Sequence, residues 1–364
     1  MVTMSEVAKA AGVSQAAVSY AYSRPSKVSS GQRARIFEVA EELGYHGPDA
    51  AGRSLRGGRV GAVGVMVMDS LGYAFSDPSN MQLLRGIAEE GELADVAVTL
   101  LPSPRPGPSD NKDPLGHRQA SAGMRGLVDG VIIHNLPQGH AAVDAVIARG
   151  IPVVVVDSPK LRGVPYVGLD DRSAAASAAQ HLLALGHRRI GILVDRLAPD
   201  GRSGVASPSR ISHASDRVAR ARVQGYLQQL EASGIARSSV PVIEAGGFQL
   251  EDYAKASGQL LDDYDVTAIL VASDVMALEA MSVATQRGLS IPAELSVVGF
   301  DDAPGAAEAG LTTVSQPMVE KGRIAAQLLL KAIATGELGS VLLPTEFIVR
   351  SSTARPQKRQ SGSR

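Results

Sequence analysis

The chain has 364 residues, which is long enough for two or three domains, and a formal net charge of −1 at pH 7. It contains no cysteine, which excludes disulfides, thiolate metal ligands and cysteine nucleophiles. We see neither a secretory leader nor an apolar run near the roughly 20 residues that span a bilayer, so we expect a soluble cytoplasmic protein with no membrane partner.

The first elements are predicted to be two short helices joined by a tight turn. Thr3 or Ser5 can cap the first helix, and one face of it repeats apolar side chains at Val7, Ala8 and Ala11. Gly12 ends this helix where a positive φ is wanted, and Ser14 can cap a second helix that begins at Gln15. Such a pair predicts a helix-turn-helix unit, whose second helix enters the DNA major groove, although any small helical hairpin has the same pattern.

A third helix and a short hinge helix are predicted next. Ser29 or Ser30 caps the third helix, whose apolar stripe consists of Ile36, Val39, Ala40 and Leu43. Residues 49–56 indicate a helix of two turns, followed by a Gly57-Gly58 linker. A helix this short is not stable alone in water, so another surface must hold it. Residues 1–59 carry eight Lys or Arg against five Asp or Glu, a mild basic bias that is weak evidence for DNA binding by itself.

From residue 59 onward, apolar strands alternate with amphipathic helices. Strands are predicted at 60–68, 96–101, 130–133, 152–156, 167–169, 190–194, 268–271 and 295–299. Helices are predicted at 80–92, 141–149, 173–185, 218–233, 253–262 and 275–287. This alternation indicates βαβ units and parallel sheets covered on both faces, and the number of strands predicts two α/β subdomains. Ligands of such sheets bind at the carboxyl ends of the strands.

Two segments of the core lack periodicity. Residues 102–116 carry five prolines and residues 198–215 are rich in Gly, Ser and Arg, so both are expected to be mobile surface loops at strand ends. They could serve as lids or partner-binding elements, but tolerated insertions are the simpler interpretation. The polar residues 355–364 are expected to form a disordered tail.

Several short motifs carry a resemblance that spans essentially the whole chain. They are Val7-Ala-Lys-Ala-Ala-Gly-Val-Ser14, Val18-Ser19, Val28-Ser29, Leu43-Gly-Tyr45, Gly130-Val-Ile-Ile133, Leu185-Gly-His-Arg-Arg-Ile-Gly191, Arg222-Val-Gln-Gly-Tyr226, Ala272-Ser-Asp274, Ser296-Val-Val-Gly-Phe-Asp-Asp302 and Leu311-Thr-Thr-Val-Ser-Gln316. Each motif is weak alone, but in this number and order they make the chain similar to the LacI/GalR family of transcriptional regulators.

The resemblance implies an all-α helix-turn-helix domain followed by an α/β, periplasmic-binding-protein-like core of two parallel-sheet subdomains. The helix-turn-helix domain would cover 1–47 and the hinge helix with its linker 48–58. The effector-binding and dimerisation core would cover 59–354, and its strands would cross three times between the subdomains. The expected N-subdomain is about 59–160 and 317–340, and the C-subdomain about 163–313 and 343–354.

The resemblance also places the DNA contacts on the second helix. Base contacts would come from Gln15, Ala16 and Tyr20, and backbone contacts from Ser14, Ser19 and Ser29. Glutamine can pair with adenine N6 and N7, and the alanine methyl group can meet thymine. Tyr20 stands where the family usually has arginine, and Ser23 where asparagine is common, so the family's usual half-site cannot be assumed. A merely solvated role for Gln15 and Tyr20 is the alternative.

In the family, hinge leucines of two subunits wedge into the minor groove at the operator centre and kink the DNA. The resemblance assigns this role to Leu55, with Arg53 beside it; packing of Leu55 against the core is the alternative. Two departures are visible. Gly47 adds a residue before the hinge, and Gly52 replaces the usual alanine, which costs the hinge helix about 0.8–1.0 kcal/mol of helix propensity.

Effector contacts are implied at the carboxyl ends of the core strands. The family positions fall at or beside Asp69, Asp157, Arg222, Phe248, Ser273, Asp301 and Gln316, and the alignment at Asp69 could shift by one residue. Carboxylates and a guanidinium bond to hydroxyl groups, and an aromatic ring offers a platform to a sugar, so a small polyhydroxylated effector is expected. For each acidic residue, the alternative is a solvated strand end or a helix cap.

Other functions have less support. An enzyme is not expected, because no Gly-x-Gly-x-x-Gly follows the first strand, and there is neither a phosphate-binding loop nor clustered metal ligands; nothing indicates a cofactor. A solute-binding protein shares the core but would need export, and a regulator without a ligand is a third possibility. We expect a repressor that binds a pseudo-palindromic operator as a homodimer, under control of a small sugar-like effector.

Overall fold

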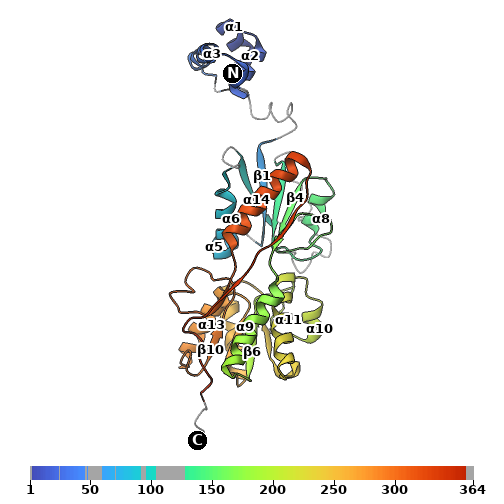
Figure 1. The fold of residues 1–364 in the computed structure, drawn as a ribbon, viewed down its shortest axis with the longest axis vertical. Coiled ribbons are helices and arrows are strands. Elements are labelled where there is room, and N and C mark those ends of the chain that lie inside the picture. The colour runs from blue at the N-terminus through green and yellow to red at the C-terminus, as the bar shows by residue number, and fades with distance from the viewer. Residues whose placement is uncertain are drawn as a thin grey trace, which may run out of the picture. The chain divides into compact units, whose positions relative to one another are not determined.

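The computed structural model describes residues 2–23, 25–45, 47, 60–69, 71–91, 96–103 and 128–357. Contacts divide the chain into two compact units, residues 1–61 and 62–364 (Figure 1). The predicted hinge helix, with Arg53 and Leu55, lies outside the described residues, and so does most of the predicted loop at 102–116. In the described ranges, no helix has both the length and the apolar character needed to cross a membrane.

The first unit is a bundle of three helices, as predicted. They are α1 (Met4–Ala11), α2 (Gln15–Ser23) and α3 (Ser30–Glu42), with a 3-10 turn η1 (Pro25–Lys27) before α3. Their shared core is small and consists of Val7, Ala8, Ala11, Val18, Ala21, Ile36 and Ala40. Because so little apolar surface is buried, the ends of these helices depend on their caps.

The predicted caps are present. Thr3 and Glu6 form a reciprocal capping box at the start of α1, and Gly12 ends the helix in the left-handed region with φ 69°. The Ser14 hydroxyl accepts from the Ala17 backbone N–H at 3.1 Å, and the Ser29 hydroxyl accepts from that of Gln32 at 3.2 Å. These bonds satisfy N–H groups that a helix leaves without partners at its first turn.

The second unit begins with a six-stranded parallel sheet in the order β12-β5-β4-β3-β1-β2. Its strands are β1 (Ala62–Met68), β2 (Ala97–Ser103), β3 (Gly130–His134), β4 (Val153–Val156), β5 (Tyr166–Gly168) and β12 (Ser340–Leu342). Helices α6 (Pro78–Ala88) and α14 (Met318–Thr335) pack on one face, and α8 (Ala141–Ile147) packs on the other. A short helix, α5 (Leu71–Ser76), follows β1.

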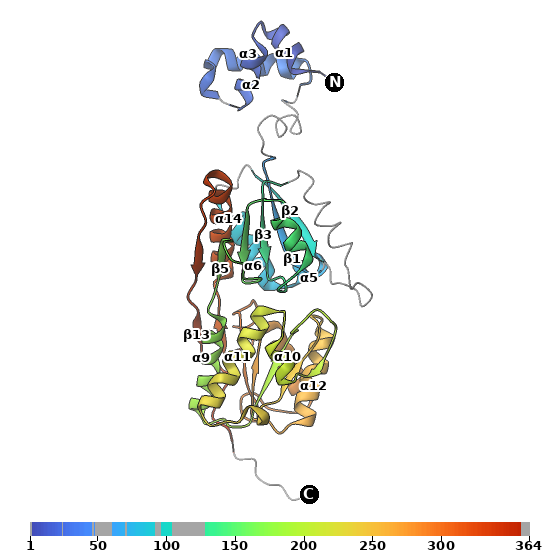
Figure 2. The same cartoon turned by 90° about the vertical axis from the view of Figure 1, so that its right-hand side faces the viewer.

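A five-stranded sheet forms the second subdomain, in the order β10-β9-β6-β8-β7. Its strands are β6 (Ile190–Val194), β7 (Gly204–Val205), β8 (Val242–Glu244), β9 (Ala268–Val271) and β10 (Ser296–Val298), and only β7 runs antiparallel to its neighbour. Its helices are α9 (Asp171–Leu185) and α11 (Arg217–Ala232) on one face, and α12 (Leu250–Asp263) and α13 (Asp274–Gln286) on the other (Figures 1 and 2).

The chain crosses between the two sheets three times, as the resemblance implied. It leaves the first sheet after β5, returns after β11 (Thr313–Ser315) to form α14 and β12, and leaves again into β13 (Glu346–Ile348), which pairs antiparallel with β11. Figure 2 shows α14 beside the first sheet, with β13 leading away toward α9. The parallel-sheet fold class expected from the sequence is confirmed.

Two details of the sequence interpretation are wrong. The second subdomain does not begin at 163, because β5 pairs with both β4 and β12 in the first sheet, so the crossover comes later, between Gly168 and α9. Residues 198–215 are not an irregular loop, since they contain β7 and the short helix α10 (Pro208–Ser212). The Arg210 guanidinium holds this segment by ion pairs to Asp200 at 2.6 Å and Glu244 at 2.8 Å.

Helices α6 and α14 cross in direct backbone contact because each contributes a glycine. A Cβ atom added to Gly86 would lie 1.9 Å from the carbonyl oxygen of Val319, and one added to Gly322 would lie 2.2 Å from that of Leu83. No side chain fits at this crossing. Helix α14, which carries groups of the site described below, is therefore fixed closely to α6.

Gly86→Ala should lower the free energy of unfolding of the core by about 1–3 kcal/mol, because the added methyl group pushes the two helix backbones apart. Thermal unfolding followed by circular dichroism measures the change. Gly91→Ala is the control, since no atom of the described residues lies within 4 Å of its added Cβ atom. An unchanged melting temperature for Gly86→Ala would show that the crossing is looser than described.

Candidate functional site

Helix α2 presents an exposed face that carries the predicted base-reading residues. Gln15, Ala16 and Tyr20 are exposed, whereas Val18 and Ala21 on the opposite face are buried in the bundle. Tyr20 keeps 39% of its surface accessible. The arrangement leaves these three side chains available to a groove.

The predicted backbone-contacting serines lie at the helix ends. Ser14 and Ser29 are exposed, and each hydroxyl already accepts a capping hydrogen bond. A hydroxyl that accepts still has its own hydrogen to donate, so both serines can cap a helix and donate to a phosphate oxygen. Ser19 is half-buried, and the side chain of Ser23 lies outside the described residues.

A cavity of about 640 Å³ lies between the two core sheets. Six of the seven expected effector residues line it, namely Asp157, Arg222, Phe248, Ser273, Asp301 and Gln316. Asp69 is not part of the lining, although its neighbour Met68 is. The volume of the cavity is within the range of small-molecule sites, about 300–1,000 Å³.

Strand ends bring these side chains together. Asp157 follows β4 of the first sheet, while Ser273 follows β9 and Asp301 follows β10 of the second sheet. Asp157 has φ 63° and Asp301 φ 126°, so the backbone turns sharply where each strand ends. Since the carboxyl ends of both parallel sheets face the same space, polar groups from both subdomains meet there.

Arg222 of α11 is the centre of the network on the side of the second sheet. It is buried; its Nε donates to Asp171 at 3.1 Å, and its Nη1 donates to Asp301 at 3.0 Å and to the Ala272 carbonyl at 2.6 Å. The guanidinium also lies over the Phe300 ring, 3.6 Å from its centroid. Burial raises the pKa of Asp301 to about 8, even though Arg222 acts to lower it.

Lys321 of α14 is fully buried and binds Asp157 from the side of the first sheet. Its Nζ donates to the two Asp157 carboxylate oxygens at 2.7 and 2.8 Å, and to Gln316 Oε1 at 2.7 Å. Burial acts to raise the pKa of Asp157, but Lys321 and His134, through their charges and hydrogen bonds, together outweigh burial and lower that pKa. The three ammonium hydrogens are all used, so in this conformation Lys321 occupies the carboxylate that was expected to meet a ligand.

Gln316 joins the two charged groups. It accepts from Lys321 and donates through Nε2 to Asp301, which in turn accepts from Arg222. A continuous hydrogen-bonded chain therefore runs from α14 on the first sheet, through the crossover residue Gln316, to α11 on the second sheet.

Phe248 follows β8 of the second sheet but packs against the core of the first subdomain. Its ring stacks on Tyr73 of α5 with centroids 4.7 Å apart, and the Arg196 guanidinium lies 4.7 Å from its centroid. Arg196 is itself paired with Asp216 at 2.6 Å. The expected aromatic platform is therefore already in contact with two protein side chains that come from different subdomains.

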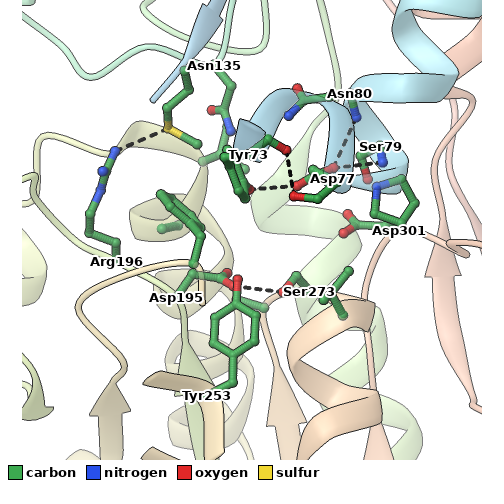
Figure 3. Close-up of a pocket in the computed structure, with 18 of the residues that line it drawn as sticks. Tyr73, Asp77, Ser79, Asn80, Asn135, Asp195, Arg196, Tyr253, Ser273 and Asp301 are labelled. Carbon is green, nitrogen blue, oxygen red and sulfur yellow. Dashed lines mark hydrogen bonds between the residues drawn. The ribbon is translucent and has the colours of Figure 1, made fainter. Parts of the chain in front are cut away.

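Sequence reasoning missed several lining residues, chiefly Tyr73, Asp77, Asn80, Asn135, Asp195, Arg196, Asp216 and Glu279. Asp77 caps α6 and accepts from the Tyr73 hydroxyl at 2.6 Å, while Asp195 accepts from Ser273 at 2.8 Å (Figure 3). Burial raises the pKa of Asp195. One signal was available, since Asp195 and Arg196 directly follow the apolar strand β6. In the described residues, no group of three or more His, Asp or Glu side chains is arranged to hold a metal ion.

Comparison with known proteins agrees with this organisation. Residues 3–48 match the family described as bacterial regulatory proteins, lacI family, and residues 179–353 match the periplasmic binding protein-like domain. The HTH-type transcriptional regulator IpsA of Corynebacterium glutamicum is 37% identical over 91% of this chain and 91% of its own length.

Two solved structures are also similar over nearly the full length. The lac repressor dimer bound to operator and the anti-inducer ONPF is 25% identical, with a TM-score of 0.79, and the match covers 97% of this chain and 99% of that one. The complex of the transcriptional regulator CelR with cellobiose is 27% identical, with a TM-score of 0.66, and the match covers 97% and 100%.

A helix-turn-helix unit followed by a two-sheet core of this topology defines the class of DNA-binding transcriptional regulators. The chain belongs to the lacI family of bacterial regulatory proteins, and its helix-turn-helix is the DNA-binding domain. The resemblance stated from the sequence motifs is thereby confirmed.

Lys321→Met should lower the free energy of unfolding by about 3–5 kcal/mol at pH 7, because it leaves the Asp157 carboxylate buried without its cation. Asp157→Asn combined with Lys321→Met should recover most of this loss. Since Lys321 lowers the pKa of Asp157, the stabilisation is present above the unfolded pKa and should be lost as the pH falls below about 4.

Urea unfolding of the full chain at a series of pH values measures these differences. Lys331→Met is the matched control, because Lys331 lies on the same helix but pairs with Glu337 at the surface. If Lys321→Met unfolded like the wild type, the buried pair would contribute nothing to stability.

Proposed function

We propose that this protein is a cytoplasmic repressor that binds a pseudo-palindromic operator as a homodimer and that a small polyhydroxylated ligand controls its DNA affinity. The observation that carries the proposal is the cavity between the sheets, whose wall includes the hydrogen-bonded chain from α14 to α11. Two similar proteins support this proposal, since the lac repressor forms a dimer on its operator and CelR forms a complex with the disaccharide cellobiose.

The coupling would act through the relative position of the two subdomains. Asp301 and Arg222 belong to the second subdomain and Asp157 and Lys321 to the first, so a ligand that bonds to both pairs favours one spacing between them. A ligand changes such an equilibrium only by the difference in its affinity for the two states. A coupling of about 1–3 kcal/mol, or 5–150-fold in DNA affinity, is usual.

The output would be the hinge at residues 49–56. We propose that Leu55 and Arg53 enter the minor groove and that the base-reading helix α2 sits in the adjacent major groove. DNA would then stabilise a hinge helix that is too short to persist alone, and the ligand would shift how readily the two hinges of a dimer meet.

Arg222→Lys tests the cavity. The substitution keeps the positive charge but loses the planar fork, so the variant should fold and bind operator while a stabilising sugar raises its melting temperature much less. A panel of mono- and disaccharides, including ribose and cellobiose, is screened by thermal shift, where a ligand at 100 times its Kd stabilises the wild type by about 2.7 kcal/mol. Arg172→Lys, an exposed change on α9, is the control. An undiminished shift in Arg222→Lys would place the ligand elsewhere.

Binding-site selection with the full chain tests the DNA end. Tyr20→Arg should change the selected base at one position of each half-site toward G, and Gln15→Ala should relax a preference for A, because these side chains would read base edges. Leu55→Ala should weaken binding without changing the selected sequence, since a wedge acts by bending the DNA.

Gln32→Ala, an exposed change at the start of α3, is the control for all three variants. An unchanged sequence preference for Tyr20→Arg and Gln15→Ala would remove both residues from base readout. Unchanged operator affinity for Leu55→Ala would refute the wedge.

A further inference from the structure

The cavity wall carries more carboxyl groups than basic groups. Six carboxyl groups line it, namely Asp77, Asp157, Asp195, Asp216, Glu279 and Asp301, whereas the basic lining residues are His134, Arg196 and Arg222. Lys321 adds one further positive charge behind Asp157. Figure 3 shows Asp77, Asp195 and Asp301 facing the same space from both subdomains.

Each positive group is already paired with a carboxylate. Arg196 binds Asp216 at 2.6 Å, and Lys321 binds Asp157 at 2.7 Å. Arg222 is shared between Asp301 at 3.0 Å and the buried Asp171 at 3.1 Å. His134 Nε2 also lies 3.7 Å from Asp157, so no basic side chain among the described lining residues is left over for a negatively charged ligand.

Three carboxyl groups have no cationic partner in the described part of the chain. Asp77 accepts from the Tyr73 hydroxyl and from two backbone N–H groups of α6, and Asp195 accepts from the Ser273 hydroxyl. Glu279, half-buried on α13, has neither a hydrogen bond nor an ion pair within the described residues. Its carboxylate is open to a donor that enters the cavity.

The usual phosphate-binding element is also blocked. The first turn of α6 points its N–H groups into the cavity region, and a helix N-terminus attracts anions. However, the Asp77 carboxylate already accepts from the Ser79 and Asn80 N–H groups at 2.7 and 3.0 Å. A ligand phosphate would meet a carboxylate at this point instead of free N–H groups.

The electrostatic potential that these carboxyl groups create inside the cavity therefore disfavours a further negative charge. Burial raises the pKa of Asp301 to about 8, and the charges of Asp274, Asp77 and Asp195 raise it further against the opposing effect of Arg222. A phosphate dianion would meet repulsion from the same carboxylates. Hydroxyl or ammonium hydrogens would instead satisfy the unpaired carboxylates.

We infer that this cavity takes a polyol, with or without an amino group, that carries no anionic group, and that it excludes sugar phosphates and sugar acids. The inference rests on the proposed function, because it concerns the ligand that would control DNA binding. Where a polyol and its phosphate both occur in the cell, we expect only the unphosphorylated form to bind in this cavity.

The test uses a small-molecule extract of bacterial cells, divided on an anion-exchange resin into an unretained and a retained fraction. Each fraction is added to the full chain on its selected operator, and DNA binding is followed by fluorescence anisotropy. The activity that changes DNA binding should appear in the unretained fraction and resist phosphatase. Activity in the retained fraction that phosphatase destroys would overturn the inference while leaving the proposed function intact. Activity in neither fraction would contradict the proposed function, and this inference with it.

A pair of variants tests the carboxylate directly. Glu279→Gln should weaken the dose response to the unretained fraction by about tenfold, because a hydrogen bond to a charged group is replaced by a neutral one. Glu308→Gln, an exposed change outside the cavity lining, should leave the response unchanged. Equal responses of wild type and Glu279→Gln would show that the open carboxylate does not recognise the ligand.

Discussion

The core depends most on the buried ammonium group of Lys321. An ammonium can only donate, so the Gln316 carbonyl oxygen must face it, and the Gln316 NH₂ group must then face Asp301. Asp301 has to accept, which leaves Arg222 as its donor. One lysine thus sets the direction of every hydrogen bond along a chain that joins the two subdomains.

This chain of hydrogen bonds is sensitive to movement of one subdomain against the other, because its side chains are buried. A charge that loses its partner inside a protein costs several kcal/mol, so the subdomains cannot slide apart at this point without exchanging partners. The cross-subdomain stack of Arg196, Phe248 and Tyr73 adds a second, aromatic contact at another part of the cavity wall. The cavity is therefore held at two places, and a ligand between them would have to fit the spacing or change it.

Much of the fold was accessible from the sequence because it is encoded locally. The caps at Thr3, Ser14 and Ser29 follow from single residues beside helical patterns, and most core strands appear as unbroken apolar runs. The sequence could not show to which sheet β5 belongs, because a three-residue strand has the same apolar pattern in either sheet. Only its pairing with β4 and β12 assigns it to the first sheet. Residues 198–215 are ordered by the ion pairs of Arg210, which leave no periodic signal.

The cavity was predicted only in part for a similar reason. Residues at strand ends, such as Asp157 and Asp301, could be predicted to line a ligand site, because an apolar strand precedes each of them in the sequence. Lys321 lies on an amphipathic helix, where a lysine is normally expected to face water, and only the three-dimensional position of Asp157 explains its burial. Tyr73 and Asp77 come from the short α5 and the loop after it, which have no periodicity to read.

The positions of the two recognition surfaces have a consequence for how such a protein can change. The side chains that would read DNA lie on the exposed face of α2, while those that line the cavity come both from helices and from the loops that follow strands. Tyr20 and Glu279 lie outside the hydrophobic clusters of their domains, so substitutions at these two positions need not destabilise the fold. Tyr20 and Glu279 could therefore be exchanged independently, whereas Lys321, Asp157 and Gln316 would have to change together, because each satisfies a buried group of the next.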